Sequence, residues 1–569
     1  MSARGPRSKL LTLVRASAPS RAGCGLAALS IALLILSFPD FNLWPLAWVG
    51  LVPLMIAILR GPRVKQAFVL SWAAATFFFY GTCYWLTHAM VHYGGIPWWV
   101  AYPLLFPGAM IVGVFPALWG ATLARVGARQ GVGRALTLAP FAWAALEWAR
   151  LGVTGQLWNA IGYSQAYVPA LIQPARWGGV YVVGFLLVSV NAALAFAVLK
   201  RDVRAYVTSS VAVCAAALVI GLSAPRATSG GQTSTPEAVA AVVIGVQPNV
   251  SVNFGRPASE TEELFNRHLS MSEAALSVWD QTRPRRSLSD ADDARASSLF
   301  PETASQMNRD SVARIVVWPE SPMNFTYAGD TRFRERVARF ARDNHTSVIF
   351  NSLEPAPLNG LYNSAVLVDV EGRLVAQYDK IRLLPFGEYV PLPRWLPATW
   401  LLTGLVGEFT PGDKYPLMPL GESSGGVRAG IFICFESAFP SISRTFADAG
   451  ADVLINISND GYLGRTPVMR QHLANTVFRA VENNRPVLRV TNTGISAMIT
   501  PRGEVRDATD GFVPAVRTWT VARAAGAKTF YTRHGDIFAA CCAFISVIAL
   551  AATLKSRSIK NTNQIFRKR

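Results

Sequence analysis

Acidic residues are almost absent from the first 236 residues of this 569-residue chain, where only Asp40, Glu147 and Asp202 occur. They are frequent between Glu237 and Asp510, and a single one follows. Water-exposed surfaces need charges of both signs, whereas a charge inside a bilayer is costly. The distribution therefore excludes an ordinary water-soluble domain from the amino-terminal part. It predicts a membrane part that is followed by a polar domain.

Cysteine is equally scarce in the polar domain. Five of the six cysteines lie in or beside apolar stretches, and Cys434 alone lies in the polar part. A disulfide within that domain is thereby excluded, and a lone thiol becomes a candidate nucleophile, although an ordinary buried cysteine is the alternative. The histidines of the polar part, His268, His345, His472 and His534, lie in no motif typical of a Cys–His pair. Metal-ligand spacings and glycine-rich phosphate loops are also lacking, so no cofactor and no metal are expected.

Long apolar stretches are what the first 223 residues have instead. Seven are long enough to span a bilayer, and an eighth lies near the end of the chain. The expected spans are 24–38, 43–59, 67–90, 98–124, 136–150, 178–199, 205–223 and 537–554. The net charge of +19 would suit a nucleic acid, but many of the Lys and Arg residues form short clusters between apolar stretches. No nucleic-acid partner is therefore predicted.

The basic clusters also predict an orientation. They occur in the amino-terminal tail, in the loops after the second, fourth and sixth spans, and in the carboxy-terminal tail. By the positive-inside rule these segments are cytoplasmic, and the polar domain between the seventh and eighth spans lies on the outer side. The expected domains are a seven-helix bundle at 1–223, a linker at 224–238, a catalytic domain at 239–526, and a last span with a cytoplasmic tail at 527–569.

The polar domain alternates between strand and helix patterns. A strand is expected at 239–246, a helix at 262–279 and a strand at 429–435, and the last two strands at 487–491 and 497–500. Such alternation is typical of a layered α/β domain. The polar stretch 281–311 is interpreted as an insertion.

One loop of the membrane part is unusual. Residues 151–177 are apolar and aromatic but are interrupted by Gly and Pro. They indicate a re-entrant or interfacial segment, with a plain aromatic belt as the alternative. Glu147 and Arg150 beside it are candidates for a function, and pairing with each other is the simpler explanation.

Three residues with catalytic chemistry each stand where a predicted strand ends. Glu320 follows Val-Val-Trp-Pro, Lys380 precedes Ile-Arg-Leu-Leu-Pro-Phe-Gly-Glu-Tyr-Val-Pro, and Cys434 follows Gly-Ile-Phe-Ile. A rigid strand can aim a nucleophile from such a position, a carboxylate can act as its base, and an ammonium can stabilise an oxyanion. Taken singly, a turn carboxylate, a surface lysine and a buried cysteine are the alternatives.

Taken together and in this order, the three motifs resemble the Glu-Lys-Cys triad of the nitrilase superfamily. The eight expected spans and the segments 386–391, 456–461 and 529–536 narrow the resemblance to the apolipoprotein N-acyltransferases, a membrane-embedded family. The resemblance covers nearly the whole chain. It implies an αββα sandwich domain inserted between the seventh and eighth membrane helices, in the bacterial inner membrane and facing the periplasm.

The resemblance also implies a reaction. Cys434 would take the sn-1 acyl chain of a phospholipid as a thioester and pass it to the amino-terminal amine of a diacylglyceryl-cysteine on an apolipoprotein, with Glu320 as base and Lys380 as oxyanion donor. A monomer without cofactor is expected. The residues with implied supporting or substrate-binding roles are Glu388, Tyr389, Phe435, Glu436, Asn459 and Tyr462.

Two other functions are alternatives for a chain with these motifs and spans. A membrane-tethered amidase would use the triad with water as acceptor, but a single span would suffice as its tether. A transporter or scaffold would need no triad, and the scarcity of charge within the spans argues against an ion pathway.

Overall fold

The protein is described by a computed structural model. It covers residues 19–61, 63–223, 239–253, 257–282, 312–390, 395, 408–421, 426–524 and 526–555. The chain forms two compact units, one made of Met1–Pro225 with His534–Arg569 and the other of Arg226–Arg533. The expected linker at 224–238, the insertion from 283 onward and the basic tail beyond 555 lie outside the described residues.

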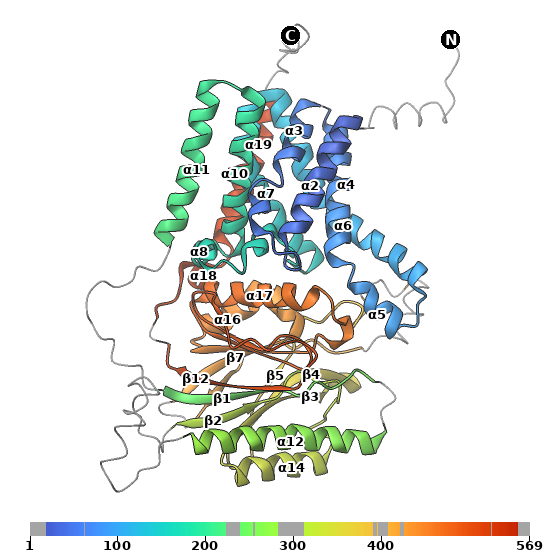
Figure 1. Ribbon diagram of the computed structural model, residues 1–569, viewed down its shortest axis with the longest axis vertical. Coiled ribbons are helices and arrows are strands. Elements are labelled where there is room, and N and C mark those ends of the chain that lie inside the picture. The colour runs from blue at the N-terminus through green and yellow to red at the C-terminus, as the bar shows by residue number, and fades with distance from the viewer. Residues whose placement is uncertain are drawn as a thin grey trace, which may run out of the picture. The chain divides into compact units, whose positions relative to one another are not determined.

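The first unit is a bundle of helices (Figure 1). Its elements are α2 (Arg21–Ser37), η1 (Trp44–Trp48), α3 (Val52–Arg60), α4 (Val64–Cys83), α5 (Leu86–His92), α6 (Trp98–Gln130), α7 (Val132–Thr154), η2 (Ile161–Gln165), α8 (Pro169–Ile172), α9 (Ala175–Gly178), α10 (Val180–Lys200), α11 (Val203–Ser223) and α19 (Ile537–Lys555).

The expectation of eight spans is met only in part. Among the described residues, four helices are long and apolar enough to cross a membrane, namely α6, α10, α11 and α19. The helices α4 and α5 add a fifth if the 55° bend between them lies within one span. α2 and the pair of η1 and α3 are apolar but shorter. α7 coincides with the expected span at 136–150 but contains Glu147 and Arg150.

The segment after α7 folds back into this unit. Glu147 Oε1 accepts the backbone N–H of Ile161 at 2.9 Å, and Arg150 Nη1 donates to the carbonyl oxygen of Trp158 at 2.7 Å. Trp158 and Tyr163 are buried, so a re-entrant segment describes this loop better than an exposed aromatic belt. Each of the two charged side chains satisfies a backbone group of the loop, which would otherwise be buried without a partner.

The second unit is an αββα sandwich, as the resemblance implies (Figure 1). Its strands are β1 (Val239–Gln247), β2 (Ala313–Val317), β3 (Ser347–Ala356), β4 (Gly360–Val368), β5 (Leu374–Asp379), β6 (Leu417–Leu420), β7 (Val427–Ile433), β8 (Val453–Ser458), β9 (Val487–Thr491), β10 (Ala497–Ile499), β11 (Val505–Arg506) and β12 (Ala515–Ala522). Its helical elements are α12 (Ala258–Gln281), α14 (Thr331–Asp343), η5 (Pro357–Asn359), η6 (Cys434–Ala438), α16 (Pro440–Asp448), η7 (Gly461–Leu463), α17 (Val468–Asn483) and α18 (Phe530–His534).

The described strands form two mixed six-stranded sheets that are built alike. Their orders are β12-β1-β2-β3-β4-β5 and β11-β10-β9-β8-β7-β6. Each sheet has three adjacent parallel strands at its centre, β1-β2-β3 and β9-β8-β7, and antiparallel strands outside them. α12 and α14 cover the outer face of the first sheet, and α16 and α17 cover that of the second (Figure 1).

Burial on both faces explains the composition of the central strands. The residues of β2 from Ile315 onward, and all of β8, are buried. Burial explains why β2 ends in a continuous apolar run without alternation, whereas β8 also holds the buried polar residues Asn456 and Ser458. Trp318 lies in the core under α12, where its ring approaches those of Phe265 and Phe350 to 6.0 and 5.9 Å. β7 is buried as well from Ala429 to Ile433, so the turns that follow β2 and β7 are both attached to buried strands.

Most expected elements are found within a few residues of their predicted bounds, but the end of the domain was predicted wrongly. The strand at 497–500 is not the last, because β11 and β12 follow it. β12 pairs antiparallel with β1, from Val239 with Ala522 to Gln247 with Ala515. β12 covers the edge of β1 and is itself the outermost strand of the first sheet. A pairing between residues so far apart in sequence leaves no local signal.

Candidate active site

Cys434 lies at the point where β7 ends and the short helix η6 begins. Its backbone φ is +51°, in the left-handed region, which costs a residue with a side chain about 1–2 kcal/mol. The strand was predicted to run to Phe435 but ends at Ile433, so the cysteine is the first residue of the turn. The sequence motif predicts a cysteine on a sharp strand-to-helix turn, and the structure shows that turn with a strained backbone at Cys434.

Glu320, Lys380 and Glu388 come together in a cluster in which Lys380 and Glu388 are buried and Glu320 is half-buried. Lys380 Nζ is 3.4 Å from Glu320 Oε1 and 2.8 Å from Glu388 Oε1. Glu320 follows β2, Lys380 follows β5, and Glu388 lies in the loop beyond, where its Oε2 accepts the backbone N–H of Leu384 at 2.7 Å. Lys380 is only 1% exposed, so the alternative of a surface lysine is wrong.

Asn363 connects the two carboxylates. Its Nδ2 donates to Glu320 Oε1 at 3.0 Å and to Glu388 Oε1 at 2.7 Å, while its Oδ1 accepts from Asn351 at 2.7 Å. Glu320 Oε2 accepts a further hydrogen bond from the backbone N–H of Asn459 at 3.2 Å. These bonds fix the direction in which the Glu320 carboxylate points.

The electrostatics at Cys434 favour the neutral thiol in the resting protein. Burial raises the pKa of Cys434, and the negative charge of Glu320 raises it further, while the Lys380 ammonium lowers it in part. Burial alone would lower the pKa of Lys380, but Glu320 and Glu388 outweigh burial and raise that pKa above its ordinary value. The site therefore combines a protonated thiol, a carboxylate and a permanent ammonium, which suits a nucleophile that gives up its proton as it attacks.

Glu436 holds the turn around Cys434 together. It is fully buried, and its Oε2 accepts the backbone N–H of Ile433 at 2.8 Å. Its Oε1 accepts the N–H groups of Ile381 and Arg382 at 2.8 and 3.0 Å, and the Tyr378 hydroxyl donates to both oxygens at 2.8 Å. Burial raises the pKa of Glu436, and these donors offset part of the rise. Glu436 thus connects the end of the cysteine strand to the residues that follow Lys380.

The predicted aromatic contacts and Asn459 take up different positions. Tyr389 is exposed, and Tyr462 lies half-buried in η7. Phe435 is half-buried and packs edge-on against Phe439, with 5.4 Å between the ring centroids. Asn459 contacts Glu320 through its backbone, and its Oδ1 accepts the N–H of Gly461 at 3.0 Å. Of this group, only Asn459 makes a hydrogen bond to the Glu-Lys pair among the contacts described.

Sequence reasoning missed several residues of the site. Asn363, Tyr378, His472 and Arg489 were not singled out. The only local signal at Asn363 is an amide within a strand, where Asn is rare. His472 was judged to lie in no Cys–His motif, and it contacts the backbone carbonyl of Cys434 at 2.8 Å through Nε2.

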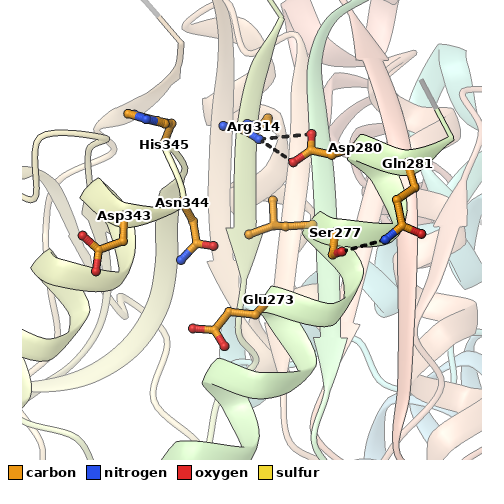
Figure 2. A pocket seen from close by; sticks show the side chains of 9 residues that line it. Glu273, Ser277, Asp280, Gln281, Arg314, Asp343, Asn344 and His345 are labelled. Carbon is orange, nitrogen blue, oxygen red and sulfur yellow. Dashed lines mark hydrogen bonds and ion pairs between the residues drawn. The ribbon is translucent and has the colours of Figure 1, made fainter. Parts of the chain in front are cut away.

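A separate polar cleft of ≈ 780 Å³ lies between α12 and α14 (Figure 2). Acidic side chains, among them Glu273 and Asp343, line it, and Arg314 pairs with Asp280 there at 3.2 Å. None of the candidate residues lines this cleft. Its charges are partly exposed, and it contains no cysteine that could act as a nucleophile.

Comparison with known proteins concerns the family of the chain as a whole. Residues 30–193 match the family model described as the apolipoprotein N-acyltransferase N-terminal domain, and residues 241–525 match the carbon-nitrogen hydrolase model. The chain is 32% identical over 545 residues to an apolipoprotein N-acyltransferase of Geobacter metallireducens, covering 94% of this chain and 96% of that protein. It is 29% identical over 510 residues to that of Sinorhizobium medicae, covering 86% and 88% of the two chains. A mutant amidase from Nesterenkonia sp. AN1 superposes with a TM-score of 0.34 at 16% identity, covering 53% of this chain and 95% of the amidase.

Proposed function

The chain belongs to the apolipoprotein N-acyltransferases of the nitrilase superfamily, and from this we propose that it moves an acyl chain from a phospholipid to a lipoprotein through a thioester on Cys434. The observation that carries the proposal is the contact of the buried Lys380 with the half-buried Glu320, beside a cysteine whose titration both groups influence. A base, a cation and a nucleophile in one buried place are the requirements of acyl transfer.

In the first step Glu320 takes the proton of the Cys434 thiol while the sulfur attacks the carbonyl carbon of the sn-1 ester. The carbonyl oxygen becomes an oxyanion, which the Lys380 ammonium stabilises together with a backbone N–H. The bond from carbon to the glycerol oxygen then breaks, and that oxygen takes the proton from Glu320. Lysophospholipid leaves, and the acyl chain stays on the sulfur as a thioester.

In the second step the amino-terminal amine of a diacylated lipoprotein attacks the thioester carbon. Glu320 accepts the proton that the amine loses, Lys380 again stabilises the oxyanion, and the bond from carbon to sulfur breaks. The thiolate recovers its proton from Glu320, and the product carries an amide. A thioester is more open to an amine than an ester is, which is the chemical reason for a sulfur nucleophile.

The acceptor separates this function from that of an amidase or hydrolase with the same triad. The purified protein would be incubated with phospholipid labelled in the sn-1 chain and a diacylated lipopeptide that has a free amino terminus. We expect N-acylated lipopeptide and lysophospholipid in equal amounts. A lipopeptide with an acetylated amino terminus is the matched control, and it should receive no label. Release of labelled fatty acid at the same rate with either peptide would show that water is the acceptor and would refute the proposal.

We also propose the finer topology, in which eight spans place the catalytic unit on the periplasmic side of the bacterial inner membrane. The alternation of basic loops and the helices found at each expected span support it. A reporter that is active only outside the cytoplasm is expected to be active when fused after Pro236 and inactive when fused after Arg569. The opposite pattern would overturn the orientation. Phospholipid as donor and a monomeric state belong to the same proposal.

A further inference from the structure

A chain of buried polar groups lies behind the nucleophile. Arg489 of β9 pairs with Asp460 Oδ2 at 3.0 Å, and Asp460 Oδ1 lies 2.8 Å from Nδ1 of His472 on α17. His472 Nε2 is in turn 2.8 Å from the carbonyl oxygen of Cys434. All three side chains are buried. Side chains from β9, from the turn after β8 and from α17 are thus connected to one backbone group, the carbonyl of Cys434.

The charges of this chain decide where the protons of its hydrogen bonds lie. Burial raises the pKa of Asp460, but Arg489 and His472 outweigh it and bring that pKa to about 2, so the carboxylate is ionised and accepts hydrogen bonds. Burial and Arg489 lower the pKa of His472, and Asp460 offsets part of this effect. A carbonyl oxygen can only accept. The bond to Cys434 therefore needs a proton on Nε2 of His472, and a bond to the ionised Asp460 needs a second proton on Nδ1. Both bonds exist together only when the ring is an imidazolium, and a neutral ring with its single proton on Nε2 keeps the bond to Cys434 alone.

The backbone of Cys434 needs such a partner. With a φ of +51° this residue is held in a conformation that it would leave if the surrounding structure did not fix it. Glu436 holds the peptide group between Phe432 and Ile433, through the N–H of Ile433. His472 binds the carbonyl group of Cys434 on the other side.

The two residues that follow β8, Asn459 and Asp460, also position Glu320, the proposed base. Asn459 donates its backbone N–H to Glu320 at 3.2 Å, and the next residue, Asp460, holds His472. The side chain of Asn459 is anchored in turn by Asn492 at 3.1 Å. The end of β8 therefore contacts Glu320 directly and Cys434 through one histidine.

We propose that His472 is a positioning residue for the acyl transfer, which fixes the main chain of Cys434 so that the thiol stays in line with Glu320 and Lys380. It does not touch substrate, and it acts through the nucleophile's carbonyl group. The inference rests on the proposed function for its kinetic consequence, but its geometric content can be tested without any acyl transfer.

Two amide substitutions separate the two contacts of the ring. In His472→Gln the side-chain amide nitrogen can occupy the place of Nε2 and still donate to Cys434. In His472→Asn the amide nitrogen can occupy the place of Nδ1, near Asp460. The asparagine side chain is too short to reach the carbonyl oxygen of Cys434. We expect His472→Gln to form acyl-enzyme within a few-fold of the wild-type rate. We expect His472→Asn to be slower by about 10–100-fold at a nearly unchanged KM for phospholipid, as a misplaced reacting group would be.

A second measurement does not depend on acyl transfer. The alkylation of Cys434 by iodoacetamide is followed against pH by the mass of its peptide, so that the other cysteines do not interfere. Because burial and Glu320 raise the pKa of this thiol, a cysteine released from the site should be alkylated at lower pH. The profile of His472→Asn is expected to shift to lower pH, and that of His472→Gln to stay with the wild type.

The matched control is His268→Asn, because His268 is also fully buried but contacts the carbonyl oxygen of Leu264 within its own helix. It reports the loss of thermal stability that comes from removing any buried histidine, and its alkylation profile should match the wild type. Equal acylation rates in His472→Asn and His472→Gln, or wild-type alkylation profiles in both, would overturn the proposal. A wild-type protein that forms no acyl-enzyme would refute the proposed function instead, and the alkylation profiles would still decide the role of His472.

Discussion

Cys434→Ala should form no acyl-enzyme and no N-acylated lipopeptide, a loss below the limit of detection, because no other group in the site can carry the acyl chain as a thioester. Cys434→Ser is the sharper variant. A hydroxyl is a much weaker acid than a thiol, so Glu320 would activate it poorly, and an acyl-serine ester would resist the amine. We expect little or no transfer from it and slow accumulation of label on the protein. The measurement is incubation with labelled phospholipid, followed by addition of the diacylated lipopeptide.

The control for these two variants is the thermal unfolding midpoint, which should stay near that of the wild type because both changes are small. Product from Cys434→Ala at a rate near that of the wild type would contradict covalent catalysis. Cys434 would then be an ordinary buried cysteine in a strained turn.

Glu320→Gln and Lys380→Met should each lower turnover by about 10²–10⁴-fold, as the loss of a general base or of an oxyanion donor does. In Glu320→Gln the thiol also loses the negative charge that raises its pKa. Its alkylation profile should therefore shift to lower pH while acylation is lost. Because a cysteine released from a collapsed site would also be alkylated at lower pH, the thermal unfolding midpoint is the control, and it should stay near that of the wild type if only the base is missing. Near-normal turnover in a folded variant would remove that residue from the mechanism.

Lys380→Met needs its own control, because it leaves the Glu388 carboxylate without its partner at 2.8 Å. Breaking a buried ion pair from one side costs about 3–5 kcal/mol of unfolding free energy. The double variant Lys380→Met with Glu388→Gln removes the orphaned charge. It is expected to regain thermal stability without regaining turnover, and recovery of turnover would show that Lys380 is not the oxyanion donor.

The sequence predicts those site residues that stand at the end of a strand. Glu320 and Cys434 could be found because each follows a continuous apolar run, which is a local signal, and Lys380 because it ends a predicted strand just before the motif Ile-Arg-Leu-Leu-Pro-Phe-Gly-Glu-Tyr-Val-Pro. Asn363 and His472 could not, because their roles depend on strands and helices that meet only in the folded sheet. Asn363 lies in β4, yet it connects carboxylates that follow β2 and β5. His472 lies on α17 and reaches a backbone oxygen at the end of β7.

The membrane part shows a different limit. Hydropathy marks an apolar stretch such as 43–59 but does not say whether one straight helix covers it. In the structure Pro45 and Pro53 begin two separate helical segments, η1 and α3, because proline is favoured in the first turn of a helix and disfavoured within one. The stretch 67–90 is likewise divided into α4 and α5 with a 55° bend. The positions of the apolar helices were predictable, and their continuity was not.

The most direct test of the central claim is the mass of the intact wild-type protein after incubation with phospholipid alone. The account predicts an increase equal to one acyl chain, located on the peptide that contains Cys434 and sensitive to hydroxylamine as a thioester is. Addition of a diacylated lipopeptide with a free amino terminus should return the protein to its original mass as the N-acylated product appears. An unchanged mass under conditions in which that product forms, or an acyl chain on any residue other than Cys434, would contradict it.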